Sequence, residues 1–384
     1  MARAAGTDGR ANLGHIRTEV ARALELFLAR QRTDLTAIGD DLMPCLDAME
    51  GLLAGGKRLR PAFCYWGWRA GGGEDCPEIY TAAAALELLQ ASALVHDDVM
   101  DASDTRRGGP AVHRQFASRF AAGQLGQSWQ AGSAAGQAGP SAQPGSAEQF
   151  GLGAAILIGD MLLAWTDELY HASGFAADVL SRGQPALNAM RTEVAAGQYL
   201  DLLSQVSQST SVRAALRVVT YKTAKYTIER PLQLGVALAA GPQSASSVAT
   251  LKGMCTEYGI PLGIAFQLRD DILGVFGDPA RTGKPVSGDI SEGKRTVLMA
   301  LARDRASASQ ARVLDRHLGD RRLTEAAAAQ VTAVLTDTGA VAECEALIAA
   351  GVKEAIAALD GAPISEDART ALAELAVMAT DRDD

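Results

Sequence analysis

Aspartates at the end of an apolar segment are the first residues in this sequence whose types and spacing could do chemistry. The segment LVHDDVMDASDTRRGG begins at Leu94 and carries Asp97, Asp98 and Asp101. If the preceding segment is helical, Asp97 and Asp101 lie one turn apart on one face. Like charges at that spacing repel, and carboxylates are unfavourable at a helix C-terminus. A hard divalent cation would offset both effects, because such ions take oxygen ligands.

A second acidic pair ends another predicted helix. The segment FQLRDDILG carries Asp270 and Asp271 after an apolar run that begins near Leu251. Helical bundles build metal sites from inward-facing acids on different helices. We therefore predict that both acid groups hold Mg²⁺, which takes about six oxygens and shares them between carboxylates, water and phosphate.

Positive charge is local in this acidic chain. The formal net charge is −9, which disfavours nucleic acid as a partner. The basic clusters include GGKRLRP at 55–61, where Pro61 suits the first turn of a helix and the cations lie at that helix start. Others are Arg106 with Arg107, Lys222 with Lys225, and Lys284 with Lys294. Cations near carboxylates fit a small polyanionic ligand bridged by metal.

The composition predicts an all-α protein. Of 384 residues, 48% are hydrophobic and only 5% aromatic, and few β-branched runs occur. Apolar periodicity predicts helices at 16–31, 42–53, 79–100, from 153, around 193–201, from 251 to the second acid pair, and from 296 to 378. Residues 1–14 should be loose, and the Gly/Ser/Ala/Gln/Pro-rich segment 121–149 a flexible loop. We expect one domain over 1–384 with that insertion.

Zinc-binding, secreted and membrane-spanning proteins are disfavoured, because the sequence lacks the features that they require. The 5 cysteines show no CxxC or zinc spacing, so they are expected to be reduced thiols. No secretory segment is recognised, and Asp160 interrupts the best membrane-span candidate, at 154–165. We expect a cytoplasmic protein with no membrane span.

A series of motifs together resembles the head-to-tail isoprenyl diphosphate synthases, most closely the bacterial geranylgeranyl diphosphate synthases. In chain order they are GGKRLRP, LVHDDVMDxSxxRRGxPAVH, GDMLLA, GQYLDL, YKTAKYT, FQxxDD and GDPxxTGKPxxxDIxEGKRT. The resemblance runs from about Arg17 into the C-terminal helices. It implies a bundle of long, mostly antiparallel helices around a deep central cavity, and a homodimer. It also implies transfer of an allylic prenyl chain (from dimethylallyl, geranyl or farnesyl diphosphate) to isopentenyl diphosphate.

The resemblance also implies roles for the residues that match these motifs. The acids of the two motifs would be catalytic and would hold about three Mg²⁺ ions. These metal ligands are Asp97, Asp98, Asp101, Asp270 and Asp271, with Asp201 beside Gln198 as a further one. The allylic diphosphate would be held by Arg106 and Lys222, both also catalytic, and by Thr223 and Lys284. Isopentenyl diphosphate would be held by Lys57, Arg60, His96 and Arg107, while Gln267 and Lys294 support the site.

Two positions depart from the family pattern. Gly274 in DDILG replaces the usual third aspartate, and Asp278 lies a full turn further on. We expect Asp270 and Asp271 to suffice, because phosphate and water complete an octahedral shell. Lys225 is more cationic than the residue in many relatives, and the sequence assigns it no role.

The helix face below Asp97 predicts the product length. Ser92 and Ala93 are small where relatives that stop at fifteen carbons carry aromatics, so the cavity should continue to a floor at Leu89 and Leu86. The predicted product is geranylgeranyl diphosphate, with twenty carbons. A longer polyprenyl product and a noncatalytic subunit of a heteromeric synthase are the alternatives.

Two other enzyme classes fit less well. A terpene cyclase would carry an Asn/Ser/Glu metal motif in place of DDILG and would not need the second diphosphate pocket supplied by GGKRLR. A metal phosphohydrolase would need further paired histidines beside His96, and the spacing of the others provides none.

Overall fold

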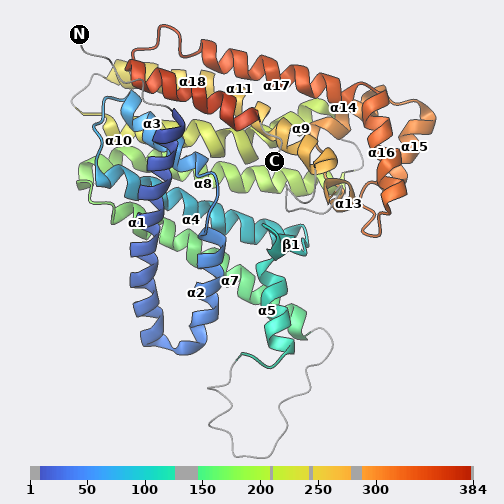
Figure 1. The fold of residues 1–384 in the computed structure, drawn as a ribbon, viewed down its shortest axis with the longest axis horizontal. Coiled ribbons are helices and arrows are strands. Elements are labelled where there is room, and N and C mark those ends of the chain that lie inside the picture. The colour runs from blue at the N-terminus through green and yellow to red at the C-terminus, as the bar shows by residue number, and fades with distance from the viewer. Residues whose placement is uncertain (1–8, 126–145, 208–210, 242–244, 278–287, 382–384) are drawn as a thin grey trace, which may run out of the picture. The chain divides into compact units, whose positions relative to one another are not determined.

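The computed structural model describes residues 9–125, 146–207, 211–241, 245–277 and 288–381. Most of these residues are helical (Figure 1), and the strands among them are one antiparallel pair of two residues each. The predicted all-α class is therefore confirmed. Lys284, Asp278 and residues 126–145 of the predicted insertion lie outside the described part.

The chain divides into two compact units, which we describe separately. The DDVMD unit comprises Arg17–Arg58 and Tyr80–Gly174. The DDILG unit comprises Met1–Ile16, Leu59–Ile79 and Phe175–Asp384. Each unit is named after the acidic motif that it contains.

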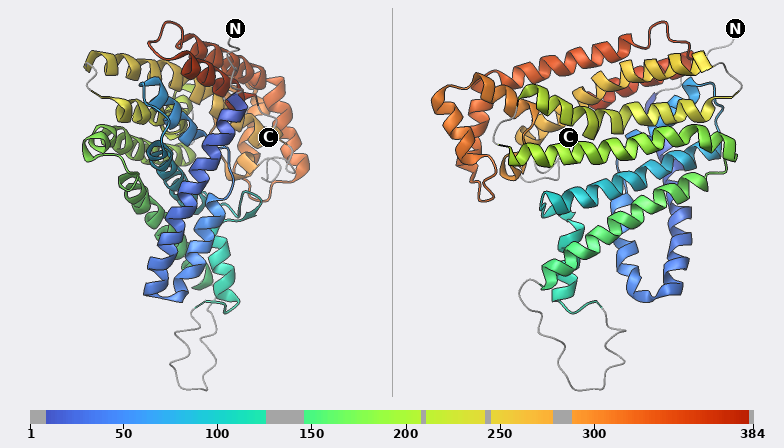
Figure 2. Two further views of the ribbon diagram at one scale, coloured as in Figure 1. Left: turned by 60° about the vertical axis from the view of Figure 1, so that its left-hand side comes forward. Right: turned by 180° about the vertical axis from the view of Figure 1, so that it is seen from behind.

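The DDVMD unit is built on the apolar helix α4. Its elements are α1 (Gly9–Ile38), η1 (Asp40–Leu42), α2 (Met43–Leu53), α4 (Pro77–Met100), β1 (Thr105–Arg106), β2 (Gly109–Pro110), α5 (Val112–Ala121) and α7 (Ser146–His171), of which α1 and α4 start in the other unit. Figure 2 shows α1 and α2 as an antiparallel pair. Arg32 on α1 joins it to Glu50 on α2 at 2.9 Å. Phe27 of α1 packs edge-on against Trp165 of α7, with ring centroids 5.8 Å apart.

The DDILG unit is a set of long helices with a smaller helical end. Its elements are α3 (Leu59–Ala70), α8 (Ala177–Val206), α9 (Val212–Val219), the π-helix η2 (Thr220–Glu229), α10 (Arg230–Ala239), α11 (Ala245–Phe276), α13 (Gly288–Glu292), α14 (Val297–Arg305), α15 (Ala308–His317), α16 (Glu325–Asp337), α17 (Ala340–Ala357) and α18 (Glu366–Thr380). The long helices α8 and α11 both pack against the shorter elements η2 and α10 (Figures 1 and 2).

Glycines let the π-helix η2 pack closely against its neighbours. A Cβ on Gly197 of α8 would lie 2.4 Å from the backbone nitrogen of Lys222, and one on Gly263 of α11 would lie 2.3 Å from Cα of Ala224. Any side chain at either position would force the helices apart. The two glycines therefore hold η2 close to both α8 and α11.

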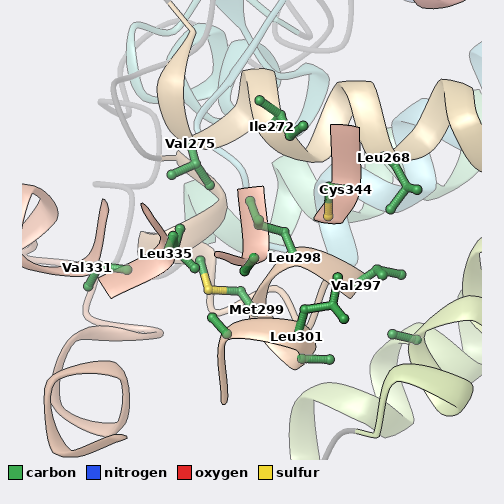
Figure 3. Close-up of a cluster of buried hydrophobic side chains, with 14 of the residues drawn as sticks. Leu268, Ile272, Val275, Val297, Leu298, Met299, Leu301, Val331, Leu335 and Cys344 are labelled. Carbon is green, nitrogen blue, oxygen red and sulfur yellow. The ribbon is translucent and has the colours of Figure 1, made fainter. Parts of the chain in front are cut away.

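An apolar cluster lies behind the acidic end of α11 (Figure 3). Leu268, Ile272 and Val275 recur at helical spacing on α11 and are buried against α14, α16 and α17. The cluster includes Leu298 of α14 and Cys344 of α17. Burying this stripe sets the rotation of α11 about its axis, and with it the direction in which the acids point.

Several helices begin at other residues than the sequence predicts. Helix α1 begins at Gly9, inside the segment expected to be loose, while α7 and α11 begin before their predicted starts. Helix α10 begins at Arg230, directly after the π-helix η2, with Pro231 in its first turn. The β1–β2 pair and the π-helix were not predicted, since neither has a periodicity of its own in the sequence.

Two helices are long and apolar enough to span a membrane by length and composition. In Pro77–Met100, 72% of the most apolar window is buried, and in Ser146–His171, 39%. The first of them is the core helix of the DDVMD unit, which accounts for its composition.

Candidate active site

The first acidic motif is paired with an arginine of its own unit. Asp98 is 1% exposed and accepts from Nε of Arg106 at 2.9 Å, and a second guanidinium nitrogen of Arg106 contacts the same oxygen. Oδ2 of Asp97 lies 3.7 Å from Arg106, and Asp101 is also buried. The structure thus gathers positive charge around these acids, as their repulsion predicts.

The β1–β2 hairpin positions this arginine. Arg106 pairs with Gly109, and the two turn residues Arg107 and Gly108 have φ of 53° and 77°. Two successive positive φ values are typical of a type I′ turn. Arg107 donates to the carbonyl of Leu52 at 2.6 Å, at the C-terminal end of α2. The hairpin therefore directs its two arginines to different partners, one to the acids and one to a helix end.

The loop carrying Lys57 is anchored by a buried ion pair that the sequence reasoning missed. Arg58 has φ of 51°, is 7% exposed, and lies 2.5 Å from Glu87 on α4; it also contacts the carbonyl of Leu53. Lys57 itself is exposed, and its carbonyl accepts from Nε of Arg17 at 3.1 Å. A glutamate inside the otherwise apolar run 82–89 was the signal that could have revealed the pair.

His96 contacts the GDMLLA motif. Its Nε2 lies 3.5 Å from Oδ1 of Asp160 and 3.3 Å from the carbonyl of Ile156. A Cβ on Gly159 would lie 2.2 Å from the same ring nitrogen. The glycine of GDMLLA thus makes room for the imidazole, and its aspartate lies beside it.

The chain-length candidates on α4 differ in accessibility. Ser92 and Leu89 are each 3% exposed, and Leu86 is fully buried. Ala93 retains partial exposure, as does Asp97 one turn later. Ala93 therefore lies on the accessible stripe of the helix, whereas Ser92 is packed.

A cavity of about 130 Å³ in the DDILG unit brings together most of the predicted residues of that unit. Its predicted lining residues are Asp201, Lys222, Thr223, Gln267, Asp270, Asp271 and Lys294. They come from α8, η2, α11 and the segment after α13. Residues that are far apart in the sequence therefore form one polar surface.

Hydrogen bonds order this cavity. Nζ of Lys222 lies 2.6 Å from Oδ2 of Asp201. Thr223 donates to Oε1 of Gln267 at 2.6 Å, and Nε2 of Gln267 donates to Oδ1 of Asp271 at 2.8 Å. The close approach of η2 to α8 and α11 places these groups within reach.

Asp271 is the most perturbed acid of the cavity. Its side chain is 4% exposed, and Oδ2 is buried without a hydrogen-bond partner among the described residues. Burial raises the pKa of Asp271 to about 8, against the opposing effect of the Gln267 hydrogen bond. The negative charges of Asp289 and Asp270 raise this pKa further. A cation next to Asp271 would reverse this penalty.

The remaining basic candidates have local partners. Nη2 of Arg60 donates to Thr227 at 2.8 Å, and its guanidinium lies 4.4 Å from the ring centroid of Tyr226. Lys294 lies 2.8 Å from Oε2 of Glu292 and 3.4 Å from Oδ1 of Asp289.

Lys225 belongs to a separate ionic network. Its Nζ lies 2.9 Å from Oε2 of the buried Glu229 and 3.7 Å from Glu193. Arg230 donates two hydrogen bonds to Glu193, at 2.7 and 2.6 Å. Burial opposes ionisation of Glu193, but the Arg230 hydrogen bonds prevail and lower its pKa. Lys225 therefore neutralises the buried Glu229 and the half-buried Glu193, and it is not among the residues that line the cavity.

The donor set fits Mg²⁺ that shares its shell with other ligands. Within the described ranges, no three His, Cys, Asp or Glu side chains form a complete metal-binding group. However, the cavity offers carboxylate oxygens, one of them the buried Oδ2 of Asp271 without a hydrogen-bond partner among those ranges. Mg²⁺ prefers oxygen ligands and usually retains waters or phosphates.

Comparison with known families agrees with this chemistry. A polyprenyl synthetase model matches residues 44–128 and 142–335. The chain belongs to the polyprenyl synthetase family. The family match omits 129–141, which lies inside the segment predicted to be an insertion.

Relatives in the polyprenyl synthetase family differ in the product that their names record. A geranylfarnesyl diphosphate synthase of Aeropyrum pernix is 33% identical over 253 residues, 65% of this chain and 67% of that protein. A geranylgeranyl diphosphate synthase of Saccharolobus solfataricus is 30% identical over 270 residues, 70% of this chain and 69% of that protein. A crystal structure of a geranylgeranyl pyrophosphate synthase from Corynebacterium glutamicum, complexed with isoprenyl diphosphate and magnesium, is 37% identical with a TM-score of 0.85. It covers 96% of this chain and 98% of its own. The predicted enzyme class, a polyprenyl diphosphate synthase, is confirmed.

Proposed function

We propose that this polyprenyl diphosphate synthase condenses isopentenyl diphosphate with an allylic diphosphate in a Mg²⁺-dependent reaction and makes geranylgeranyl diphosphate. The observation that carries the proposal is the cavity of the DDILG unit. There a lysine, a glutamine and several acids converge, as a diphosphate–metal site requires. Membership of the polyprenyl synthetase family supplies the reaction class.

The acids of both motifs are assigned to Mg²⁺. The proposed metal ligands are Asp97, Asp98, Asp101, Asp201, Asp270 and Asp271. Mg²⁺, when bound, neutralises the charge that develops on the leaving diphosphate. About three ions would serve one diphosphate together with its waters.

The basic residues are assigned to the two diphosphates. Arg106, Lys222, Thr223 and Lys284 would bind the allylic substrate, with Gln267 and Lys294 in support. Lys57, Arg60, His96 and Arg107 would bind isopentenyl diphosphate. Cations placed where negative charge develops stabilise the transition state, and holding the second alkene near the allylic cation supplies proximity. The released diphosphate can accept the proton, so the reaction needs no protein base.

The product length is assigned to the accessible stripe on α4. A small residue at Ala93, one turn before Asp97, leaves room for a chain longer than fifteen carbons. The buried Leu89 and Leu86 would form the floor. Ser92 is packed, so it contributes less to the channel than Ala93.

We also propose that the chain acts as one synthase domain, forms a homodimer and is cytoplasmic. Helix α7 carries exposed apolar side chains at about every second turn, namely Phe150, the adjacent pair Ile156 and Leu157, and Leu163. Such a stripe is typical of a surface that another subunit covers. Light scattering of the purified protein tests this, and a monomer would rule the homodimer out.

The deciding experiment is an elongation assay with product sizing. The protein is incubated with Mg²⁺, isopentenyl diphosphate and each allylic starter in turn (dimethylallyl, geranyl and farnesyl diphosphate). We expect elongation that stops at twenty carbons and is abolished by EDTA. Longer products would favour the long-chain alternative, and no elongation with any starter would favour a noncatalytic subunit.

A further inference from the structure

Arg60, in the first turn of α3, is held by neutral groups only. Its Nη2 donates to the hydroxyl of Thr227 at 2.8 Å, and its guanidinium lies over the ring of Tyr226, 4.4 Å from the centroid. No carboxylate of the described residues forms an ion pair with Arg60, whereas the nearby Arg58 is paired with Glu87. Arg60 is therefore fixed in place while its positive charge stays uncompensated.

Both partners of Arg60 are rigid parts of the π-helix η2. Tyr226 is 2% exposed and Thr227 is 0% exposed, and α3 packs directly against η2. The end of η2 is also close to α11, because a Cβ on Gly259 would lie 2.9 Å from Cα of Glu229. The ring and the hydroxyl thus have little freedom, and the guanidinium that they hold is preorganised for a ligand.

The same π-helix carries two groups that are assigned to the other substrate. Lys222 and Thr223 line the cavity of the DDILG unit, where hydrogen bonds hold them. Tyr226 and Thr227 follow about one turn later on η2. Such π-helical turns are frequent at functional sites. One rigid element therefore sets the positions of groups that are assigned to both diphosphates.

We propose that Tyr226 and Thr227 are positioning residues that hold Arg60 ready for the diphosphate of isopentenyl diphosphate. A ring face and a neutral hydroxyl orient the guanidinium by cation–π attraction and a hydrogen bond, and neither cancels its charge. A carboxylate in their place would compete with the phosphate for the same donors. The start of α3 adds the positive end of a helix dipole. The inference rests on the proposed function, which assigns Arg60 to this substrate.

Steady-state kinetics of the full chain tests the role by separating the two substrates. Isopentenyl diphosphate is varied at saturating farnesyl diphosphate, and then the reverse. We expect Thr227→Val and Tyr226→Leu each to raise KM for isopentenyl diphosphate about 10-fold, the effect of losing one contact to a charged group. KM for farnesyl diphosphate should change by less than about two-fold. Thr227→Ser and Tyr226→Phe keep the hydroxyl and the ring face, so both should stay near the wild-type values.

A double-variant cycle shows whether the effect passes through Arg60. Thr227→Val should add less than about two-fold to the rise in KM caused by Arg60→Met, because the hydroxyl then has no guanidinium to hold. A matched control is Thr166→Val, which removes a buried hydroxyl that donates to the carbonyl of Leu162 within α7 at 2.9 Å. This control should leave both KM values unchanged. Circular dichroism and Tm establish that each variant is folded.

The possible outcomes separate the inference from the proposed function. If Arg60→Met raises KM for isopentenyl diphosphate but Thr227→Val and Tyr226→Leu do not, the inference is overturned and the assignment of Arg60 stands. Equal rises in KM for both substrates, or fully additive effects in the cycle, would also overturn it. If Arg60→Met changes neither KM, the assignment of Arg60 fails together with the inference. A wild type that elongates no allylic starter would refute the proposed function itself.

Discussion

Nζ of Lys222 lies 2.6 Å from Oδ2 of Asp201, so a cation and an acid proposed for the same diphosphate site neutralise one another. The pair forms because Gly197, one turn before Asp201, lets the π-helix approach α8. The lysine is thereby held in the cavity, where it lies ready for a phosphate without a large loss of side-chain entropy.

Removing this cation should impair catalysis more than folding. We expect Lys222→Met to lower kcat/KM by about 100-fold, since a positioned cation stabilises the leaving diphosphate. Lys222→Arg should retain part of the activity because it keeps the charge. Steady-state kinetics with farnesyl and isopentenyl diphosphates measures both variants. If kcat/KM of Lys222→Met stays within about two-fold of the wild-type value, the proposed role is excluded.

The pKa of Asp271 makes the stability of the metal-free protein depend on pH. Burial raises this pKa to about 8, from about 3.9 in an unfolded chain. The contribution of Asp271 to the free energy of unfolding is fully present below the unfolded pKa. It is lost as the pH rises from that value through the folded pKa of about 8. In EDTA, Asp271→Asn should therefore flatten the fall in unfolding free energy between about pH 4 and about pH 8. At pH 9 it should exceed the wild type by about 1 kcal/mol.

Mg²⁺ should reverse that dependence, because it binds the deprotonated carboxylate. Thermal stabilisation of the wild type by Mg²⁺ with inorganic diphosphate should grow as the pH rises toward 8. Denaturant titrations at several pH values measure the free energy of unfolding without the metal and its increase when Mg²⁺ and diphosphate are present. Parallel pH curves for the wild type and Asp271→Asn would show that the acid does not titrate in this range.

Removing one partner of the buried Arg58–Glu87 pair should lower the free energy of unfolding more than removing both. Glu87→Ala leaves a buried guanidinium without its acid and is expected to cost about 3–5 kcal/mol. The double variant Arg58→Met/Glu87→Leu should cost much less. Glu343→Ala is the control, because its pair with Arg305 is exposed and should contribute under about 1 kcal/mol. Equal losses in Glu87→Ala and Glu343→Ala would contradict the prediction, which denaturant unfolding measures.

The two small residues of α4 should respond differently to phenylalanine. Ala93→Phe places a ring on the accessible stripe and should shorten the product to fifteen carbons. Ser92→Phe overpacks a buried position and should destabilise the fold by about 1–3 kcal/mol. Product sizing and Tm separate the outcomes. If both variants still make the wild-type product, the proposed channel is wrong.

Lys225 should affect stability without affecting diphosphate binding. Lys225→Met removes the ammonium beside the buried Glu229 and should destabilise the protein by about 1–3 kcal/mol. Glu229→Gln in the same background should recover part of the loss, because the buried charge is then gone. A selective rise in KM with unchanged stability would instead place Lys225 at the substrate.

The sequence by itself determined the helical class, the acids at the ends of two apolar helices and the motifs that indicate the family. These features are local: periodicity and charge spacing depend on residues a few positions apart. Only the tertiary structure decided which distant groups meet. Arg58 contacts Glu87, Lys225 contacts Glu193, and Asp289 covers Gly274. These contacts depend on the rotation of each helix about its axis, which is set when its apolar stripe is buried. They also depend on how closely glycines let two helices approach. No short stretch of sequence encodes either quantity.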